Sequence, residues 1–373
     1  MLLKDIGERD LTRRINQLVV KSGAPPLNLD DCGILGPSPK KGIIVATTDP
    51  CPVPNFVQKI GLGDFKSAGW LCVVKSLSDI AAAGAKPMGI FIGIEFPLTM
   101  PVSQFDDFFS GVLDATNTYN TRLIGGNLKE SMGNAPKESK KRYHAESFAV
   151  GITEGNNVLS RGQVYPNDIV GIVENNDLGG FWAESVLHLT QKPASKKIQK
   201  ILKGMATRPT PKLHEGLLLA KNKYVRFCMD SSDGLISCLL EMIRKQNLDV
   251  TLEIKRDSLS EAIQKAANLV HADPRMWALG WGGCCLVCAI PENQLGKIQN
   301  SLKKCSANFI PIGQITRGKG RILLKTLRGN LPLNIFPLIT CEQFKEGGFW
   351  QLGIDKYEEL MLSKNIESLT VKS

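Results

Sequence analysis

The residues of this chain that could do chemistry are aspartates at the ends of expected strands and helices. In chain order they are Asp30-Asp31, Asp49 after Thr47-Thr48, Asp79 after Ser78, and Asp230 and Asp233 in the stretch Asp-Ser-Ser-Asp-Gly. A carboxylate inside an apolar helix costs free energy unless it is paired or bound to a cation. Oxygen ligands from several segments suit Mg²⁺, which takes one or two carboxylates together with substrate phosphates. The set predicts Mg²⁺–phosphate chemistry, although Asp31 alone could be a turn residue and Asp233 alone a helix N-cap.

Other chemistries lack their signatures. The chain has no GxxxxGK[ST] loop and no protein-kinase motif, and the glycines at 61 and 63 are too few for a dinucleotide fingerprint. Cys284-Cys285-x-x-Cys288 is the single cysteine cluster, and it could ligate a metal or form a buried strand. Because a second cysteine pair at finger-like spacing is missing, we expect the strand.

Alternating strands and helices must position the aspartates. The apolar periodicity predicts strands at 42–47, 88–95, 122–126 and 146–153, with helices at 64–83 and from 103 onward. From residue 161 the pattern restarts, with strands at 169–173, 225–229, 250–254, 284–290, 309–315 and 321–324, and helices at 180–189, 212–221, 233–246, 260–269 and 293–304. We therefore expect an α/β protein with domains at 1–154 and 155–330, followed by a tail at 331–373.

The composition narrows the possible partners. The 373 residues carry a net charge of +10, which suits nucleic acid, an anionic membrane or a phosphorylated small molecule. Aromatic residues make up 6% and do not interleave with basic ones, and no apolar run approaches the ~20 residues of a membrane span. The N-terminus lacks the apolar core of a signal peptide. We expect a cytoplasmic protein that binds a small molecule and neither nucleic acid nor membrane, with the lysine-rich stretch at 196–203 as solvated surface.

Seven short stretches carry a family resemblance. They are DDCGIL at 30–35, TTD at 47–49, KSLSDIAAAGAKP at 75–87, LIGGN at 123–127, LSR at 159–161, RPTP at 208–211 and MDSSDGL at 229–235. In this order they resemble the superfamily of aminoimidazole ribonucleotide synthetase, selenophosphate synthetase, the hydrogenase-maturation carbamoyl-dehydrating protein and thiamine-monophosphate kinase. The likeness is greatest to thiamine-monophosphate kinase.

The resemblance implies a two-domain α/β fold in a homodimer, with N-terminal strands that complete a barrel shared by the two copies. It assigns ATP and Mg²⁺ binding and dimerisation to residues 1–154. It implies Mg²⁺ ligands at Asp31, Thr47, Thr48, Asp49, Asp79 and Asp230. It implies ATP contacts at Gly126, Asn127, Arg161 and Ser232, and it makes Asp230 and Asp233 the catalytic residues, with Asp233 near the transferred phosphoryl group or a further Mg²⁺.

Two departures from the family pattern concern charge. Asn127 replaces an aspartate, and Gly280-Trp281-Gly282-Gly283-Cys284-Cys285-Leu286 replaces a Gly-Gly-Glu-Asp-Tyr-Glu substrate motif without keeping a carboxylate. The acceptor pocket is therefore expected to be rebuilt. Three functions stay open: phosphoryl transfer to a small molecule, ATP-dependent activation of an amide or carbonyl oxygen by a synthetase, and nucleotide binding without catalysis.

Overall fold

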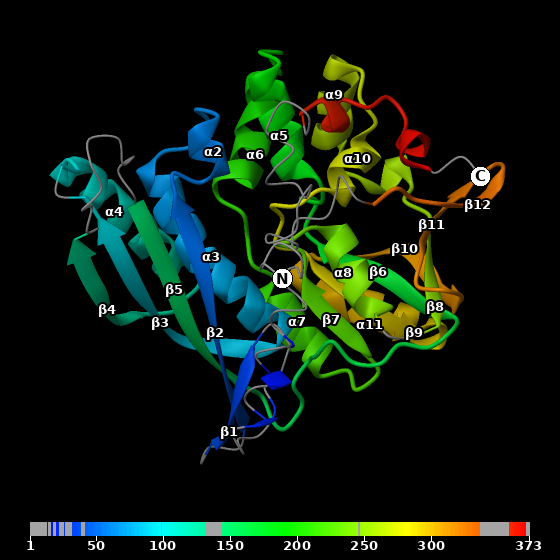
Figure 1. Cartoon of the computed structure of the whole chain (residues 1–373), viewed down its shortest axis with the longest axis horizontal. Coiled ribbons are helices and arrows are strands. Elements are labelled where there is room, and N and C mark those ends of the chain that lie inside the picture. The colour runs from blue at the N-terminus through cyan, green and yellow to red at the C-terminus, as the bar shows by residue number, and fades with distance from the viewer. Residues whose placement is uncertain are drawn as a thin grey trace.

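Two β-sheets, each covered by its own helices, lie side by side in the computed structural model (Figure 1). The structure describes residues 42–335 apart from 98, 131–142 and 245–246, together with 32–38, 358–370 and six residues between 13 and 26. Within these residues, none of the helices combines the length and the apolar character needed to cross a bilayer.

The first sheet has five strands in the order β1-β2-β5-β3-β4. Its strands are β1 (Gly33–Ser38), β2 (Gly42–Val53), β3 (Ala85–Phe96), β4 (Leu123–Glu130) and β5 (Tyr143–Thr153), and its helices are α2 (Phe56–Lys59), α3 (Phe65–Ala82) and α4 (Val102–Thr118). All neighbouring strands are antiparallel except β3 and β4. The face that carries α3 is called the inner face below, and the opposite face is the outer face.

Helix α3 crosses the inner face and carries Asp79. Asp64 and Ser67 form a capping box at its start, in which each side chain accepts a 2.8 Å hydrogen bond from the backbone N–H of the other. Glycines let α4 pack closely on α3, because a Cβ at Gly69 would lie 1.9 Å from Phe108 O and a Cβ at Gly111 would lie 1.9 Å from Lys66 O. The close crossing fixes the rotation of α3 and so the direction of its polar side chains.

The second sheet has seven strands in the order β12-β11-β8-β10-β6-β9-β7. They are β6 (Asp168–Glu174), β7 (Phe227–Asp230), β8 (Leu248–Leu252), β9 (Leu286–Pro291), β10 (Asn308–Arg317), β11 (Ile322–Thr326) and β12 (Gly329–Pro332). Its helices are α5 (Gly180–Leu189), α6 (Lys196–Thr207), α7 (Leu213–Ala220), α8 (Leu235–Met242), α9 (Glu261–Val270), α10 (Pro274–Leu279) and α11 (Leu295–Leu302). Short 3-10 turns such as η4 (Lys303–Cys305) join some of these elements.

The two sheets share a core through helices that lie between them. Residues of α3 and α4 pack in one apolar cluster with α7, α11 and one face of the second sheet, to which Cys288 and Ile290 of β9 belong. The other face of that sheet, with Val287 and Ala289, packs on α5, α8, α9 and α10. The helix α3 is thus held between both halves of the chain, which places its aspartate beside both.

The residues 358–370 pack on the second sheet. Met361, Ile366 and Leu369 are buried in its core, and Trp277 of α10 donates a 2.8 Å hydrogen bond to the carbonyl of Met361. Asp273 Oδ2 accepts a 2.9 Å bond from Ile366 N. This part of the segment that we predicted as a tail is therefore built into the fold.

The lysine-rich stretch at 196–203 is solvated surface, as expected, and it lies on the helix α6, which was not predicted. Its lysines face water, but Leu202 and Ala206 are buried against α5 and the first half of the chain. The cysteine cluster lies in and next to the buried strand β9, as predicted, and all nine described cysteines are free thiols.

Candidate functional site

The inner face of β2 and one side of α3 bring three predicted residues together. Residues alternate between the two faces of β2, so Thr47 and Asp49 both face α3. Thr47 Oγ1 donates a 2.6 Å hydrogen bond to Asp79 Oδ2. Lys75 Nζ donates to Asp49 Oδ1 at 2.5 Å and to the carbonyl of Pro50 at 2.9 Å. A hydroxyl, two carboxylates and an ammonium therefore line one short stretch of this helix.

The loop after β7 carries the second pair of predicted aspartates. Asp230 ends the strand and is 2% exposed, and Ser232 Oγ donates a 3.0 Å hydrogen bond to its Oδ1. The loop is tied to the stretch before β9, because Ser231 N donates to Cys285 O and Cys285 N donates to Ser231 Oγ. Asp233 lies close enough to Asp49 for its negative charge to favour the protonated form of that carboxyl. The loop of the second half thus faces the polar side of α3.

Burial and charge act against each other at Asp49 and Lys75. Burial raises the pKa of Asp49, and the ammonium of Lys75 opposes that rise without cancelling it. Burial disfavours the charged form of Lys75, but the carboxylate of Asp49 outweighs this and holds the lysine pKa above its usual range. Lys75 is therefore a cation at neutral pH.

Cys284 lies between the two groups of aspartates. Burial, together with the charge of Asp230, raises the pKa of Cys284 to about 12, and the nearby hydroxyl of Ser78 on α3 opposes the rise. The thiol is therefore neutral at physiological pH. At the position where the resemblance led us to expect an acidic residue, the site has an uncharged group.

Gly126 of β4, an expected nucleotide contact, lies in the same cross-strand row of the first sheet as Asp49 of β2. Register pairs Asp49 with Ser147, Ser147 with Ile92 and Ile92 with Gly126, so Gly126 lies three strands from Asp49, about 14 Å away. Gly126 has no room for a side chain, because a Cβ there would lie 2.0 Å from Ile92 O. The close approach explains why this edge strand carries a glycine.

Thr48 and Asn127 belong to the outer face. Alternation along β2 turns Thr48 away from α3, and its hydroxyl donates a 2.8 Å hydrogen bond to Glu146 Oε1 of β5. Asn127 shares a cross-strand row with Gly93 and Glu146, which also places it on the outer face. The structure therefore separates these two predicted residues from Thr47, Asp49 and Asp79 by the thickness of the sheet.

The remaining predicted residues are Arg161 and Asp31. The segment around Arg161 runs between the end of α3 and β7, since Leu159 N donates to Ala83 O and Cys228 N donates to Ser160 O. This path brings Arg161 near the strand that ends at Asp230. Asp31 lies outside the described residues.

Sequence reasoning missed Lys75 and Glu146. Lys75 precedes Asp79 by four residues in the helix α3, so both side chains leave the same face. That spacing was a usable signal. Glu146 is paired with Pro50 only through the β2–β5 register, and it lies 98 residues from its hydrogen-bond partner Thr48, so local spacing carried no signal for it.

The stretch Gly280–Leu286, where the acceptor was expected, is closed by aromatic rings. Trp281 packs on Phe56 of α2 and on Phe181 and Trp182 of α5, with ring centroids 5.1 to 5.4 Å apart. Trp182 Nε1 donates a 2.9 Å hydrogen bond to Trp281 O. The cavity beside Trp281 and Cys285 has a volume of only about 20 Å³.

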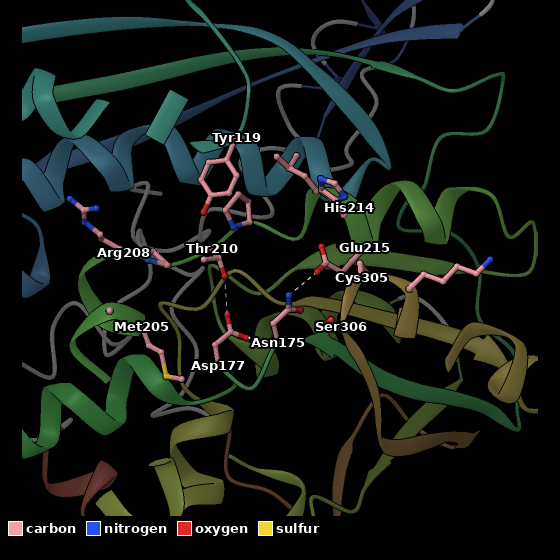
Figure 2. A pocket seen from close by; sticks show the side chains of 15 residues that line it. Tyr119, Asn175, Asp177, Met205, Arg208, Thr210, His214, Glu215, Cys305 and Ser306 are labelled. Carbon is pink, nitrogen blue, oxygen red and sulfur yellow. Dashed lines mark hydrogen bonds between the residues drawn. The ribbon is translucent and has the colours of Figure 1, made fainter. Parts of the chain in front are cut away.

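A larger cavity, of about 790 Å³, opens on another side of the shared core (Figure 2). It lies between the end of α4, the end of β6 and the segment from Arg208 to Glu215. Thr210 Oγ1 donates to Asp177 Oδ2 at 3.3 Å, and Asn175 Nδ2 donates to Glu215 Oε1 at 2.9 Å (Figure 2). Asp177 Oδ2 also accepts from Lys212 Nζ at 2.5 Å. The described residues that line it include none of the predicted site residues, so the aspartates of α3 and the β7 loop remain the candidate site.

Comparison with known proteins agrees with this architecture. Residues 29–153 match the family model described as AIR synthase related protein, N-terminal domain. The thiamine-monophosphate kinase of Haemophilus influenzae is 25% identical over 344 residues, which cover 91% of this chain and 99% of that protein.

Two solved structures share the fold. One, named AaThiL complexed with AMPPCP and TMP, aligns with a TM-score of 0.69 and 21% identity over 89% of this chain and 98% of its own. Another, the thiamine monophosphate kinase of Aquifex aeolicus, aligns with a TM-score of 0.64 and 21% identity over 87% and 98%. The chain is therefore similar in sequence to a thiamine-monophosphate kinase, shares the fold of two solved structures, and resembles the AIR synthase related N-terminal domain over its first sheet.

Proposed function

We propose that this chain transfers a phosphoryl group from ATP to a small-molecule acceptor with the help of Mg²⁺. The observation that carries the proposal is the Thr47–Asp79 hydrogen bond next to Asp49, whose carboxyl feels the charge of Asp233 in the β7 loop. The curated relatives of the chain are named thiamine-monophosphate kinases. Phosphoryl transfer needs metal ions that neutralise the phosphates and a protein that positions donor and acceptor in line. Both sheets contribute to the site, as that positioning requires.

The donor set fits Mg²⁺ in its chemistry. Thr47, Asp79 and Asp230 offer hydroxyl and carboxylate oxygens, the ligands that this hard cation prefers, and we propose that they hold it together with Asp31. Across the described residues, no three His, Cys, Asp or Glu side chains already form a group that could hold a metal ion. ATP phosphates and water would therefore complete the coordination. When bound, Mg²⁺ would neutralise charge on the transferred group.

The other predicted residues receive roles at the nucleotide. We propose that Arg161 and Ser232 contact the phosphates, with Asp233 beside the transferred group. Gly126 leaves the edge strand open to the nucleotide, and Asn127 contacts it from the outer face. A guanidinium near phosphates adds a charge-assisted hydrogen bond.

The acceptor is proposed to differ from thiamine monophosphate. Thiamine is a cation, and the stretch at 280–286 offers it no carboxylate. Cys284 and Cys285 are buried there as neutral thiols, and the neighbouring cavity is too small for a thiamine ring. These features support a smaller or uncharged acceptor, whose binding would need the rings around Trp281 to move.

Product analysis with ATP labelled on its γ-phosphate tests the function. Label retained on an acceptor supports the kinase, with thiamine monophosphate as the reference acceptor. Free phosphate with a condensed product would show the synthetase reaction instead. Nucleotide binding without any turnover would show a non-catalytic homologue. Mass spectrometry of small molecules that co-purify with the chain would name acceptors to try.

The outer face of the first sheet supports a homodimer. Phe91 and Phe148 are cross-strand partners on this face and are 39% and 41% exposed, and Ile124 beside them is 51% exposed. We propose that a second copy covers these side chains and that the strands of both copies complete a barrel. The nine free thiols among the described residues fit a reducing compartment such as the cytoplasm.

A further inference from the structure

Lys75 is the one cation that faces the predicted metal ligands from α3, among the residues that the structure describes. Its side chain is 25% exposed, and that of Asp49 is 16% exposed. Two of the three N–H groups of the ammonium are used, one by Asp49 Oδ1 at 2.5 Å and one by the carbonyl of Pro50 at 2.9 Å. A partly buried ion pair of this kind holds its geometry, because separating it would leave two charges with reduced access to water and no partner.

The position of this ammonium conflicts with a metal ion at Asp49. A divalent ion bound to Asp49 Oδ1 would have to displace Lys75 or lie against it, and two cations at such a distance repel each other strongly. Thr47 and Asp79 are differently placed, because their hydrogen bond joins two oxygens that a metal ion can share. Asp49 therefore does not fit the role of a Mg²⁺ ligand, whereas Asp79 does.

We propose that the Lys75 ammonium is a built-in cation that occupies Asp49 in place of one divalent ion. Its third N–H is left to donate to a phosphate oxygen of the nucleotide. The loop aspartate Asp233, whose charge acts on both members of the pair, also faces this position. The inference rests on the proposed function, since it assumes that ATP and Mg²⁺ bind at the remaining carboxylates.

Manganese binding tests the inference. Mn²⁺ replaces Mg²⁺ at oxygen sites, and the loss of the free Mn²⁺ signal in electron paramagnetic resonance counts bound ions. The full chain would be titrated with Mn²⁺ in the presence of AMPPCP as wild type, Lys75→Met and Lys75→Arg. Lys75→Met keeps the length of the side chain and frees Asp49, so we expect about one additional Mn²⁺ per chain. Lys75→Arg keeps the charge and should bind as many ions as wild type.

Lys66→Met is the matched control. Lys66 lies on the same helix, and it pairs with Asp114 at 3.0 Å where both side chains are 38% exposed. Removing its charge should leave the number of bound Mn²⁺ ions unchanged. An equal count in wild type and Lys75→Met, with both proteins folded by circular dichroism, would overturn the inference.

A reciprocal variant covers the case in which Lys75→Met does not fold. Asp49→Asn removes the carboxylate that we assign to Lys75, so the Mn²⁺ count should equal that of wild type. A lost ion in Asp49→Asn would mean that Asp49 ligates metal and would overturn the inference.

The outcome for wild type separates the two proposals. Wild type that binds no Mn²⁺ with AMPPCP would refute the proposed function. A Mn²⁺ ion gained by Lys75→Met in that case would still support the role of Lys75. The absence of Mn²⁺ from both proteins would refute both proposals.

Discussion

The hydroxyl of Thr47 and the carboxylate of Asp79 lie 2.6 Å apart and join strand β2 to helix α3. Thirty-two residues separate them in the chain, so the contact exists only once the helix has packed on the sheet. The bond holds the carboxylate of Asp79 against the inner face of β2. It also makes the site dependent on correct packing of the first half.

Asp79→Asn should weaken Mg²⁺-dependent ATP binding by about tenfold or more, because a metal ligand loses its charge. The asparagine carbonyl can still accept the hydrogen bond from Thr47, so the fold should be retained. Isothermal titration with AMPPCP, with and without Mg²⁺, measures the effect. Binding and turnover equal to those of wild type would refute the metal role of Asp79.

Lys212→Met should destabilise the fold by about 3 to 5 kcal/mol, because it leaves Asp177 in a buried position without its cation. The side chain of Lys212 is 1% exposed, and its ammonium lies 2.5 Å from Asp177 Oδ2. Urea unfolding followed by tryptophan fluorescence measures the loss. Lys66→Met breaks an exposed pair and should cost less than about 1 kcal/mol. Equal losses in the two variants would contradict the prediction.

Glu184→Gln should change how stability depends on pH. Burial raises the pKa of Glu184 from 4.5 to about 7, although Lys203 opposes the rise, and Glu184 Oε2 has no hydrogen-bond partner in the described part of the chain. The folded protein therefore binds this proton more tightly than the unfolded chain. The stability that results is present at low pH and is lost as pH rises from about 4.5 to about 7.

Titration of Glu184 should lower the free energy of unfolding by about 3 kcal/mol by pH 8. A glutamine does not titrate and would avoid this loss. Glu184→Gln should thus be more stable than wild type at pH 8 and close to it at pH 4.5. Free energies of unfolding in urea at both pH values test this. A constant difference across the pH range would show that the carboxyl does not titrate there.

Phe148→Arg should weaken the proposed dimer by about 30-fold or more, because it places a charge at the centre of the apolar outer face. Light scattering coupled to size exclusion measures the mass in solution. Leu113→Arg is the control, since Leu113 is 49% exposed on α4 and away from that face. A wild-type chain that is monomeric at all concentrations would refute the dimer itself.

Local patterns predicted most elements of the fold. The apolar spacing along α3 and the alternation along β5 are properties of the chain itself, so the sequence reveals them. The helix α6 escaped prediction because lysines outnumber its two buried residues, Leu202 and Ala206. Such a helix is formed by packing against neighbours that the local sequence does not show.

The site was harder to predict than the fold. The motifs indicated which residue types meet, but not which face of the sheet each would occupy. Thr48 and Asn127 lie on the outer face because of the register between four strands, which no short stretch encodes. The pairing of Lys75 with Asp49 similarly depends on how α3 is rotated against β2.

The packing of residues 358–370 determines the order in which the two halves of the chain can fold during synthesis. The strands of the first sheet are complete once residue 153 has left the ribosome, so this half can begin to fold early. The core of the second sheet must wait for Met361, Ile366 and Leu369, which are synthesised about 200 residues later. Until then, the apolar surface around Trp277 stays exposed in the nascent chain, where a chaperone could bind it.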